Sequence, residues 1–359
     1  MHIVPNRALV MSGGGSKGAF QLGAVDYLVN KEGLDFQVIA GVSTGSLNAT
    51  VLAQAGPGEL KEYVRRLAEL WFGIHSDDDI YRKSPLQRIA KILAFVVLAL
   101  RNSLFLPEPL EKMLQTHVNP EKLRKSGREL RVGGVSLESG EYRSVKGTNP
   151  AILRWTLASS SIPLMFPPVK IGDQSTVDGG VRNITPLKDA MAALKDLPRA
   201  HDQVEDELWV ILASPLRVTP AKSDWGSSLG VGKRTLSILL NEIFREDLDY
   251  ALAINESVRG YEKLARELDA PSVAALRGLE LPYASPRKRA VTIWTIVPDR
   301  EYSDALSFNH DTIVKAYQAG KKAAAAPLDE KSVKAALGLG PFRAADKQPP
   351  LDVERPAAR

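Results

Sequence analysis

Residues 41–45 read Gly-Val-Ser-Thr-Gly, a serine framed by two glycines at the spacing of a nucleophile elbow. An apolar run at 36–40 predicts a strand directly before it, and the small residues of 46–53 predict a helix directly after it. Such a sharp turn projects the serine hydroxyl at a helix N-terminus, where free amide groups favour developing negative charge. Gly41 and Gly45 lack the Cβ atoms that would obstruct the turn. The pattern therefore predicts Ser43 as a nucleophile.

A glycine loop at 13–18, Gly-Gly-Gly-Ser-Lys-Gly, has two interpretations. It fits a dinucleotide-binding fingerprint between a strand and a helix, in which Glu32 or Asp35 would stand near a ribose. It also fits an oxyanion hole, because consecutive glycines let backbone N–H groups turn toward a tetrahedral intermediate. A serine elbow one strand–helix unit later favours the oxyanion hole.

A third pattern, Asp178-Gly179-Gly180, follows a short β-like segment. Upstream of it, residues 158–169 read Ala-Ser-Ser-Ser-Ile-Pro-Leu-Met-Phe-Pro-Pro-Val. An aspartate before glycine is common in turns, so this pattern gains its meaning from the others.

Taken in order, these four patterns resemble the patatin-like phospholipases over roughly residues 7–187. The resemblance implies that Ser43 is the nucleophile and that Asp178 is its only side-chain partner, a dyad without histidine. It also implies an oxyanion hole formed by the amides of Gly14 and Gly15 with help from Gly13. The supporting motif positions are Lys17, Gly18, Gly41, Gly45, Gly179 and Gly180.

Lys17 and Asp178 determine how well the chain can perform the chemistry that this resemblance implies. The family usually has arginine where this chain has Lys17. The positive charge is therefore kept, but the planar guanidinium group is lost. A carboxylate with an ordinary pKa near 4 is a poor base for a serine hydroxyl. Asp178 therefore has to be partly desolvated and close to the serine oxygen, and Gly179 and Gly180 would let its backbone approach the elbow.

Two further functions stay open. Of the five histidines, only His310 follows the last predicted strand, where the third member of a Ser-Asp-His triad is expected. The chain also fits a lipid- or nucleotide-sensing module whose serine no longer reacts.

The elements that position these residues alternate between strands and helices, which predicts a three-layer α/β/α sandwich with a mainly parallel sheet, like that of patatin. We expect one catalytic domain over 1–340 and a disordered Pro- and Ala-rich tail over 341–359. The expected strands are 7–12, 36–40, 208–213 and 290–297, with a hairpin of 130–137 and 142–145; the expected helices are 19–28, 46–53, 59–72, 152–160, 235–268 and 311–325.

Residues 88–106 are apolar nearly all round, contain Lys91 and are too short to span a bilayer. We interpret them as an apolar helical insertion over about 85–106. Three roles compete: a buried helix, a lid or lipid-contacting surface, or an oligomer contact.

Composition and motifs limit the classes of partner, cofactor and location that the sequence supports. The net charge is +5, but no basic-aromatic stripe supports a nucleic-acid partner. The chain has no cysteine and no His-Glu-x-x-His motif, so we expect neither metal nor cofactor. The N-terminus lacks the apolar core of a signal peptide, which predicts a cytoplasmic protein with peripheral membrane contact through 88–106. The expected substrate is a phospholipid or lysophospholipid.

Overall fold

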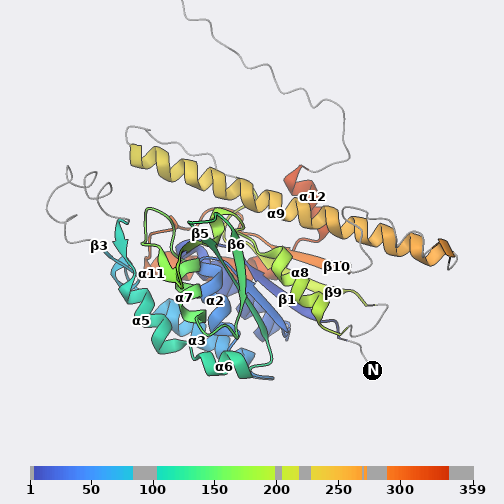
Figure 1. The fold of residues 1–359 in the computed structure, drawn as a ribbon, viewed down its shortest axis with the longest axis horizontal. Coiled ribbons are helices and arrows are strands. Elements are labelled where there is room, and N and C mark those ends of the chain that lie inside the picture. The colour runs from blue at the N-terminus through green and yellow to red at the C-terminus, as the bar shows by residue number, and fades with distance from the viewer. Residues whose placement is uncertain are drawn as a thin grey trace, which may run out of the picture.

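An eight-stranded sheet forms the centre of the molecule (Figure 1). The computed structural model describes residues 4–83, 103–198, 204–217, 228–268, 271–272 and 289–338. The strand order is β10-β9-β1-β2-β5-β8-β7, with β6 also pairing with β5. The strands are β1 (Arg7–Met11), β2 (Val38–Gly41), β5 (Glu129–Ser136), β6 (Tyr142–Lys146), β7 (Val169–Ile171), β8 (Gln174–Asp178), β9 (Asp206–Ile211) and β10 (Val291–Ile296).

The sheet has a parallel and an antiparallel part. From β10 to β5 all neighbouring strands are parallel, and Met11 at the end of β1 lies between Gly41 and Ile211. Strands β6 and β8 run antiparallel to β5, and β7 runs antiparallel to β8. Because β1 and β2 are parallel neighbours, the segments that follow them begin at the same edge of the sheet.

Helices cover both faces of the sheet. Strand β1 shows the alternation: Leu9 and Met11 belong to one core, Ala8 and Val10 to the other. The first face carries α1 (Gly18–Asp26), α2 (Thr44–Leu52), α3 (Leu60–Phe72), α7 (Ile152–Ser159) and α11 (His310–Ala324), extended by α5 (Glu108–His117) and α6 (Pro120–Lys125). The second face carries α8 (Leu187–Asp196), α9 (Ser228–Glu267) and α12 (Glu330–Leu337).

Helices α1 and α11 pack with their backbones in contact. A Cβ atom at Gly23 would lie 1.9 Å from the carbonyl oxygen of Tyr317, and one at Gly320 would lie 2.0 Å from that of Phe20. Each helix therefore presents a glycine where the other backbone passes. This contact joins the first helix of the chain to one that begins about 290 residues later.

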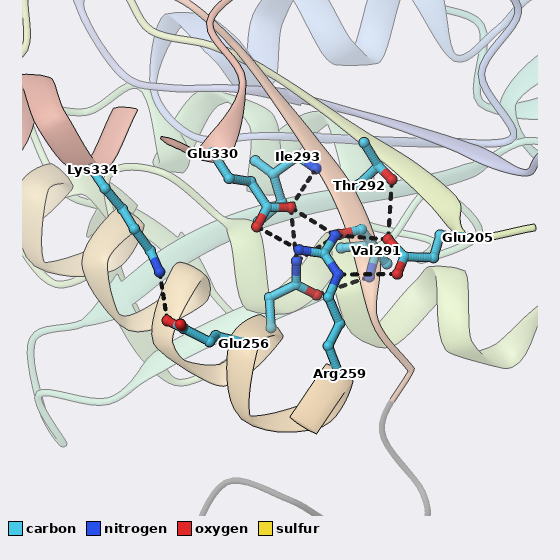
Figure 2. A network of polar contacts seen from close by, with 9 residues as sticks. Glu205, Glu256, Arg259, Val291, Thr292, Ile293, Glu330 and Lys334 are labelled. Atoms are coloured by element: carbon cyan, nitrogen blue, oxygen red, sulfur yellow. Dashed lines mark hydrogen bonds and ion pairs between the residues drawn. The ribbon is translucent and has the colours of Figure 1, made fainter. Parts of the chain in front are cut away.

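Helix α9 is 40 residues long, roughly 60 Å at 1.5 Å per residue, and extends beyond the sheet in Figure 1. Its middle packs on the second face through Phe244, Leu248 and Leu252. Farther along, Arg259 bonds Glu205 at 2.7 Å and Glu330 at 2.8 Å, which joins α9 to α12 and to the segment before β9 (Figure 2).

The structure confirms the predicted sandwich and its mainly parallel sheet. The predicted strands, the hairpin and the helices named from the sequence are present, although α9 begins at Ser228 rather than near 235. The prediction of a helical insertion reaching 106 is wrong at its end, because Phe105–Leu106 form β4, which pairs antiparallel with β3 (Arg82–Lys83). Residues 84–102 and the tail 341–359 lie outside the described residues. Among the helices described, none is long and apolar enough to cross a membrane.

Candidate active site

Ser43 occupies a strained turn between β2 and α2. Its backbone has φ 56° and ψ −131°. Residues other than glycine rarely adopt this conformation, which costs about 1–3 kcal/mol. The flanking glycines are sterically required: a Cβ atom on Gly41 would lie 2.2 Å from the carbonyl oxygen of Gly45, and one on Gly45 would lie 2.1 Å from that of Met11. The turn thus packs against both β2 and β1.

Three consecutive serines at the end of α7 hold this turn. The N–H of Ser43 donates to Ser159 Oγ at 3.1 Å, and Ser160 Oγ donates to the carbonyl oxygen of Ser43 at 3.3 Å. The carbonyl oxygen of Ser161 accepts the N–H of Asp178 at 3.0 Å. These residues therefore connect the serine turn with the end of β8. The serine run is visible in the sequence as part of a motif, but no local pattern there predicts this role.

The strand register places Asp178 at the level of the turn. Gly41 pairs with Val132 of β5, and Asp178 pairs with Gly134, two residues farther along β5. Ser43 likewise lies two residues beyond Gly41. Strand β8 therefore ends at the edge of the sheet from which Ser43 projects, although it runs in the opposite direction.

The carboxyl of Asp178 is buried and only partly hydrogen-bonded. Its Oδ1 accepts the N–H of Gly180 at 2.7 Å, whereas Oδ2 is buried without a hydrogen-bond partner. Burial raises the pKa of Asp178 to about 7, against the lowering effects of the Ser43 side chain and the Gly180 N–H. The Ser43 hydroxyl thus faces this carboxyl closely enough to affect its pKa, without forming a hydrogen bond of normal distance and angle to Oδ2. Such bonds often tighten only when substrate is bound.

The glycine loop lies against the same turn. A Cβ atom on Gly13 would stand 3.0 Å from Ser43 Cβ, so only glycine fits there without displacement. The N–H of Gly13 donates to the carbonyl oxygen of Ile184 at 3.0 Å, so the donor expected from Gly13 is engaged elsewhere. Within the described ranges, the N–H groups of Gly14 and Gly15 have no acceptor. These two amides are the ones available to a developing oxyanion.

An apolar cavity borders Ser43 and Gly15. Together with the open solvent at its mouth, it encloses about 810 Å³. Most of its wall is aliphatic or aromatic and comes from α2, α3, α5 and the segment after β10. These apolar residues include Leu47, Val51, Leu67, Leu70, Trp71, Ile74, Leu110, Met113, Leu114, Phe166, Leu306 and Phe308. A long hydrocarbon chain suits such a lining better than a charged nucleotide does.

Comparison with known proteins identifies a family. The model of the patatin-like phospholipase family matches residues 9–191, about half of the 359-residue chain. The chain belongs to this family. Patatin-like phospholipases are lipid acyl hydrolases, so the protein is an enzyme of that class. A comparison with curated proteins found no match.

Solved structures give distant matches to this patatin-like phospholipase. VipD from Legionella pneumophila is 13% identical, with a TM-score of 0.38, over 93% of this chain and 67% of that one. ExoU, a type III effector, is 13% identical, with a TM-score of 0.30, over 76% and 68%. The ExoU–SpcU complex of Pseudomonas aeruginosa is 19% identical, with a TM-score of 0.29, over 58% and 43%.

Lys17, which stands where the patatin-like family usually has arginine, has a structural partner. Its Nζ lies 2.6 Å from a carboxylate oxygen of Glu301 and 3.0 Å from Ser214 Oγ. The N–H of Ser16 also donates to the carbonyl oxygen of Ala305 at 2.9 Å. Lys17 therefore helps fasten the segment after β10 over the glycine loop.

The residues of the rival interpretations lie in other surroundings. His310 stacks on His75 with 5.0 Å between ring centroids and does not line the cavity at Ser43. Asp35 forms an ion pair with Arg128 at 2.6 Å. Among the described residues, no group of three or more His, Asp or Glu side chains is placed to hold a metal ion.

Proposed function

We propose that this patatin-like phospholipase hydrolyses a fatty-acyl ester of a phospholipid or lysophospholipid through a Ser43–Asp178 dyad. The observation that carries the proposal is a buried carboxyl with a free oxygen, facing a strained serine at the border of an apolar cavity. A serine hydroxyl needs a base to accept its proton. Asp178 is an ionisable group whose pKa is affected by the Ser43 side chain.

Acylation uses the two sides of the serine turn. Asp178 accepts the proton of the Ser43 hydroxyl as Oγ attacks the ester carbonyl carbon. The amides of Gly14 and Gly15 bind the resulting oxyanion, and a donor of this kind is worth roughly 10²–10³ in rate. Asp178 then returns the proton to the leaving alcohol oxygen, and the acyl group stays on Ser43.

Deacylation repeats the sequence with water. Asp178 takes a proton from water, which attacks the acyl-enzyme and releases the fatty acid, and the proton returns to Ser43. Because the pKa of Asp178 is about 7 rather than near 4, its carboxylate is a stronger base than an exposed aspartate, while a substantial fraction stays ionised at neutral pH.

Lipid mass spectrometry tests the proposal directly. Phospholipid and lysophospholipid vesicles incubated with the wild type should yield free fatty acid, and Ser43→Ala should lower that rate by at least about 10³-fold. His310→Ala should retain activity, because His310 stacks on His75 rather than bordering the cavity. Fatty-acid release by Ser43→Ala at the wild-type rate would refute the nucleophile, and loss of activity in His310→Ala would favour a triad.

A further inference from the structure

A second cavity lies directly behind the wall of the first. It is formed between α3 and α5 and, together with the open solvent at its mouth, encloses about 950 Å³. Four residues line both cavities: Val51, Leu70, Met113 and His117. The other residues that line the second cavity are Tyr63, Arg66, Glu69, Gly73 and Thr116.

The shared wall consists of side chains from three helices. Val51 belongs to α2, Leu70 to α3, and Met113 and His117 to α5. Val51 is buried, while Leu70 and Met113 are half-buried. Methionine is unbranched and has three rotatable bonds, so it adapts its shape to what packs against it. Met113 is therefore the most adaptable side chain in the shared wall.

The residues that line the second cavity are of two kinds. Val51, Leu70 and Met113 are apolar, whereas Arg66 and Glu69 on α3 are charged and exposed. Arg66 bonds Glu62 at 2.9 Å and lies 4.8 Å from the ring centroid of Tyr63, which fixes its position on α3. A hydrocarbon tail that passes the shared wall therefore meets the apolar side chains of Val51, Leu70 and Met113, which line both cavities.

We propose that the second cavity holds the distal methylenes of a long fatty-acyl chain and that Met113 sets the acyl-chain-length preference. The occupant follows from continuity: the wall separates this cavity from the one that borders Ser43, where the acyl carbonyl must lie. This inference rests on the proposed function. Each methylene moved from water into an apolar site is worth about fourfold in kcat/KM. The wild type should therefore gain from chain length as far as the second cavity extends.

A chain-length series of p-nitrophenyl esters, from butanoyl to hexadecanoyl in mixed micelles, measures this preference. Met113→Trp should fill the passage and lower the hexadecanoyl-to-butanoyl ratio of kcat/KM by about 15-fold, the equivalent of two methylenes. Met113→Ala should raise the ratio. Met191→Trp is the matched control, since Met191 on α8 packs against the core on the opposite face of the sheet, and its ratio should equal that of the wild type.

The outcomes separate this inference from the proposed function. An unchanged ratio in Met113→Trp, or equal loss with both esters, would overturn the role of Met113, while Ser43-dependent turnover of butanoyl ester would still support the dyad. If Met113→Trp does not fold, as judged by its thermal transition, Thr116→Trp replaces it. Thr116 is exposed and lines the second cavity but not the first. Tryptophan there should fill the second cavity from its outer side and so lower the ratio of kcat/KM.

Discussion

At the scale of single residues, the site holds two groups in unfavourable states. Ser43 adopts a positive φ, and Asp178 keeps a carboxyl that is only 4% exposed, with one oxygen unpaired. Neither state benefits the folded chain, so the surrounding packing must impose both. They suit the proposed chemistry, because a projecting hydroxyl and a carboxylate of raised basicity are what proton transfer needs.

Asp178 should make activity and stability respond to pH in opposite directions. Activity requires its ionised form and should rise as pH increases through about 7. The pKa of this carboxyl is higher in the folded than in the unfolded chain, so its contribution to stability is fully present below about pH 4 and is lost as pH rises through 7. The loss is on the order of 4 kcal/mol at most.

Asp178→Asn separates the two effects. This variant should be inactive, yet its free energy of unfolding should exceed that of the wild type by a margin that grows between pH 4 and pH 8. Denaturant titrations at several pH values, with initial rates on a soluble ester, measure both quantities. A flat acid limb in the rate profile, or a variant less stable than the wild type at pH 8, would contradict the assigned pKa.

Motifs predict the identities of these residues but not their partners. Ser43, Asp178 and the glycines stand in short patterns that the sequence displays directly. The engagement of Gly13 with Ile184, and of Ser43 with Ser159 and Ser160, depends on segments more than 100 residues apart. Such pairings arise only when the sheet has set the register, so no local pattern contains them.

At the scale of elements, α9 supports the site from the opposite layer. Asp247 accepts the N–H of Thr185 on Oδ2 at 3.3 Å, and the side-chain amide of Asn183, oriented to donate, reaches the same oxygen at 3.3 Å. Between these two residues, the carbonyl oxygen of Ile184 accepts the N–H of Gly13. One carboxylate of α9 thus holds the turn that connects the Asp178 loop to the glycine loop.

Asp247→Ala should lower kcat by about tenfold, because buried donors left without an acceptor cost about 1–3 kcal/mol and the turn would shift to relieve them. Asp247→Asn keeps one acceptor oxygen and should recover part of that loss. Asp249→Ala, at an exposed position of the same helix, should behave as the wild type in the same steady-state assay. A wild-type kcat in Asp247→Ala would show that the turn needs no support from α9.

The sequence indicates the long elements better than the short ones. Helix α3 shows a clear apolar stripe through Leu60, Tyr63, Val64 and Leu67, and the structure buries these residues. Helices α5, α8 and α12 have ten residues or fewer and are missed, whereas α1, α2 and α7, which are as short, are predicted because they adjoin the motifs. Short helices gain most of their stability from tertiary packing, so their own sequences give a weak signal.

At the scale of the whole molecule, a polar network fastens the second layer to the edge of the sheet. Figure 2 shows Arg259 of α9 between Glu205 and Glu330, while Asn255 Nδ2 donates to the carbonyl oxygen of Val291 at 2.6 Å and Oδ1 accepts its N–H at 2.8 Å. Burial of Arg259 is incomplete, since its side chain is 37% exposed, so solvent weakens each ion pair.

Arg259→Met should lower the free energy of unfolding by about 1–2 kcal/mol, because it leaves two partly buried carboxylates without their shared cation. The kcat of the folded variant should stay at the wild-type value, since the network lies among α9, α12 and β10. Arg266→Met, at an exposed position of the same helix, provides the comparison in a urea titration. Equal stability of both variants would show that the network adds nothing.

The contact between α1 and α11 has a consequence for synthesis on the ribosome. Gly15 lies beneath Ala305, and Gly23 beneath Tyr317, so residues 15–23 are covered by residues that are made about 290 positions later. A nascent chain that has not reached these residues has the serine turn but lacks the cover of the glycine loop and one wall of the cavity. The ability to hydrolyse lipid esters is thereby delayed until residues 305–317 have emerged from the ribosome.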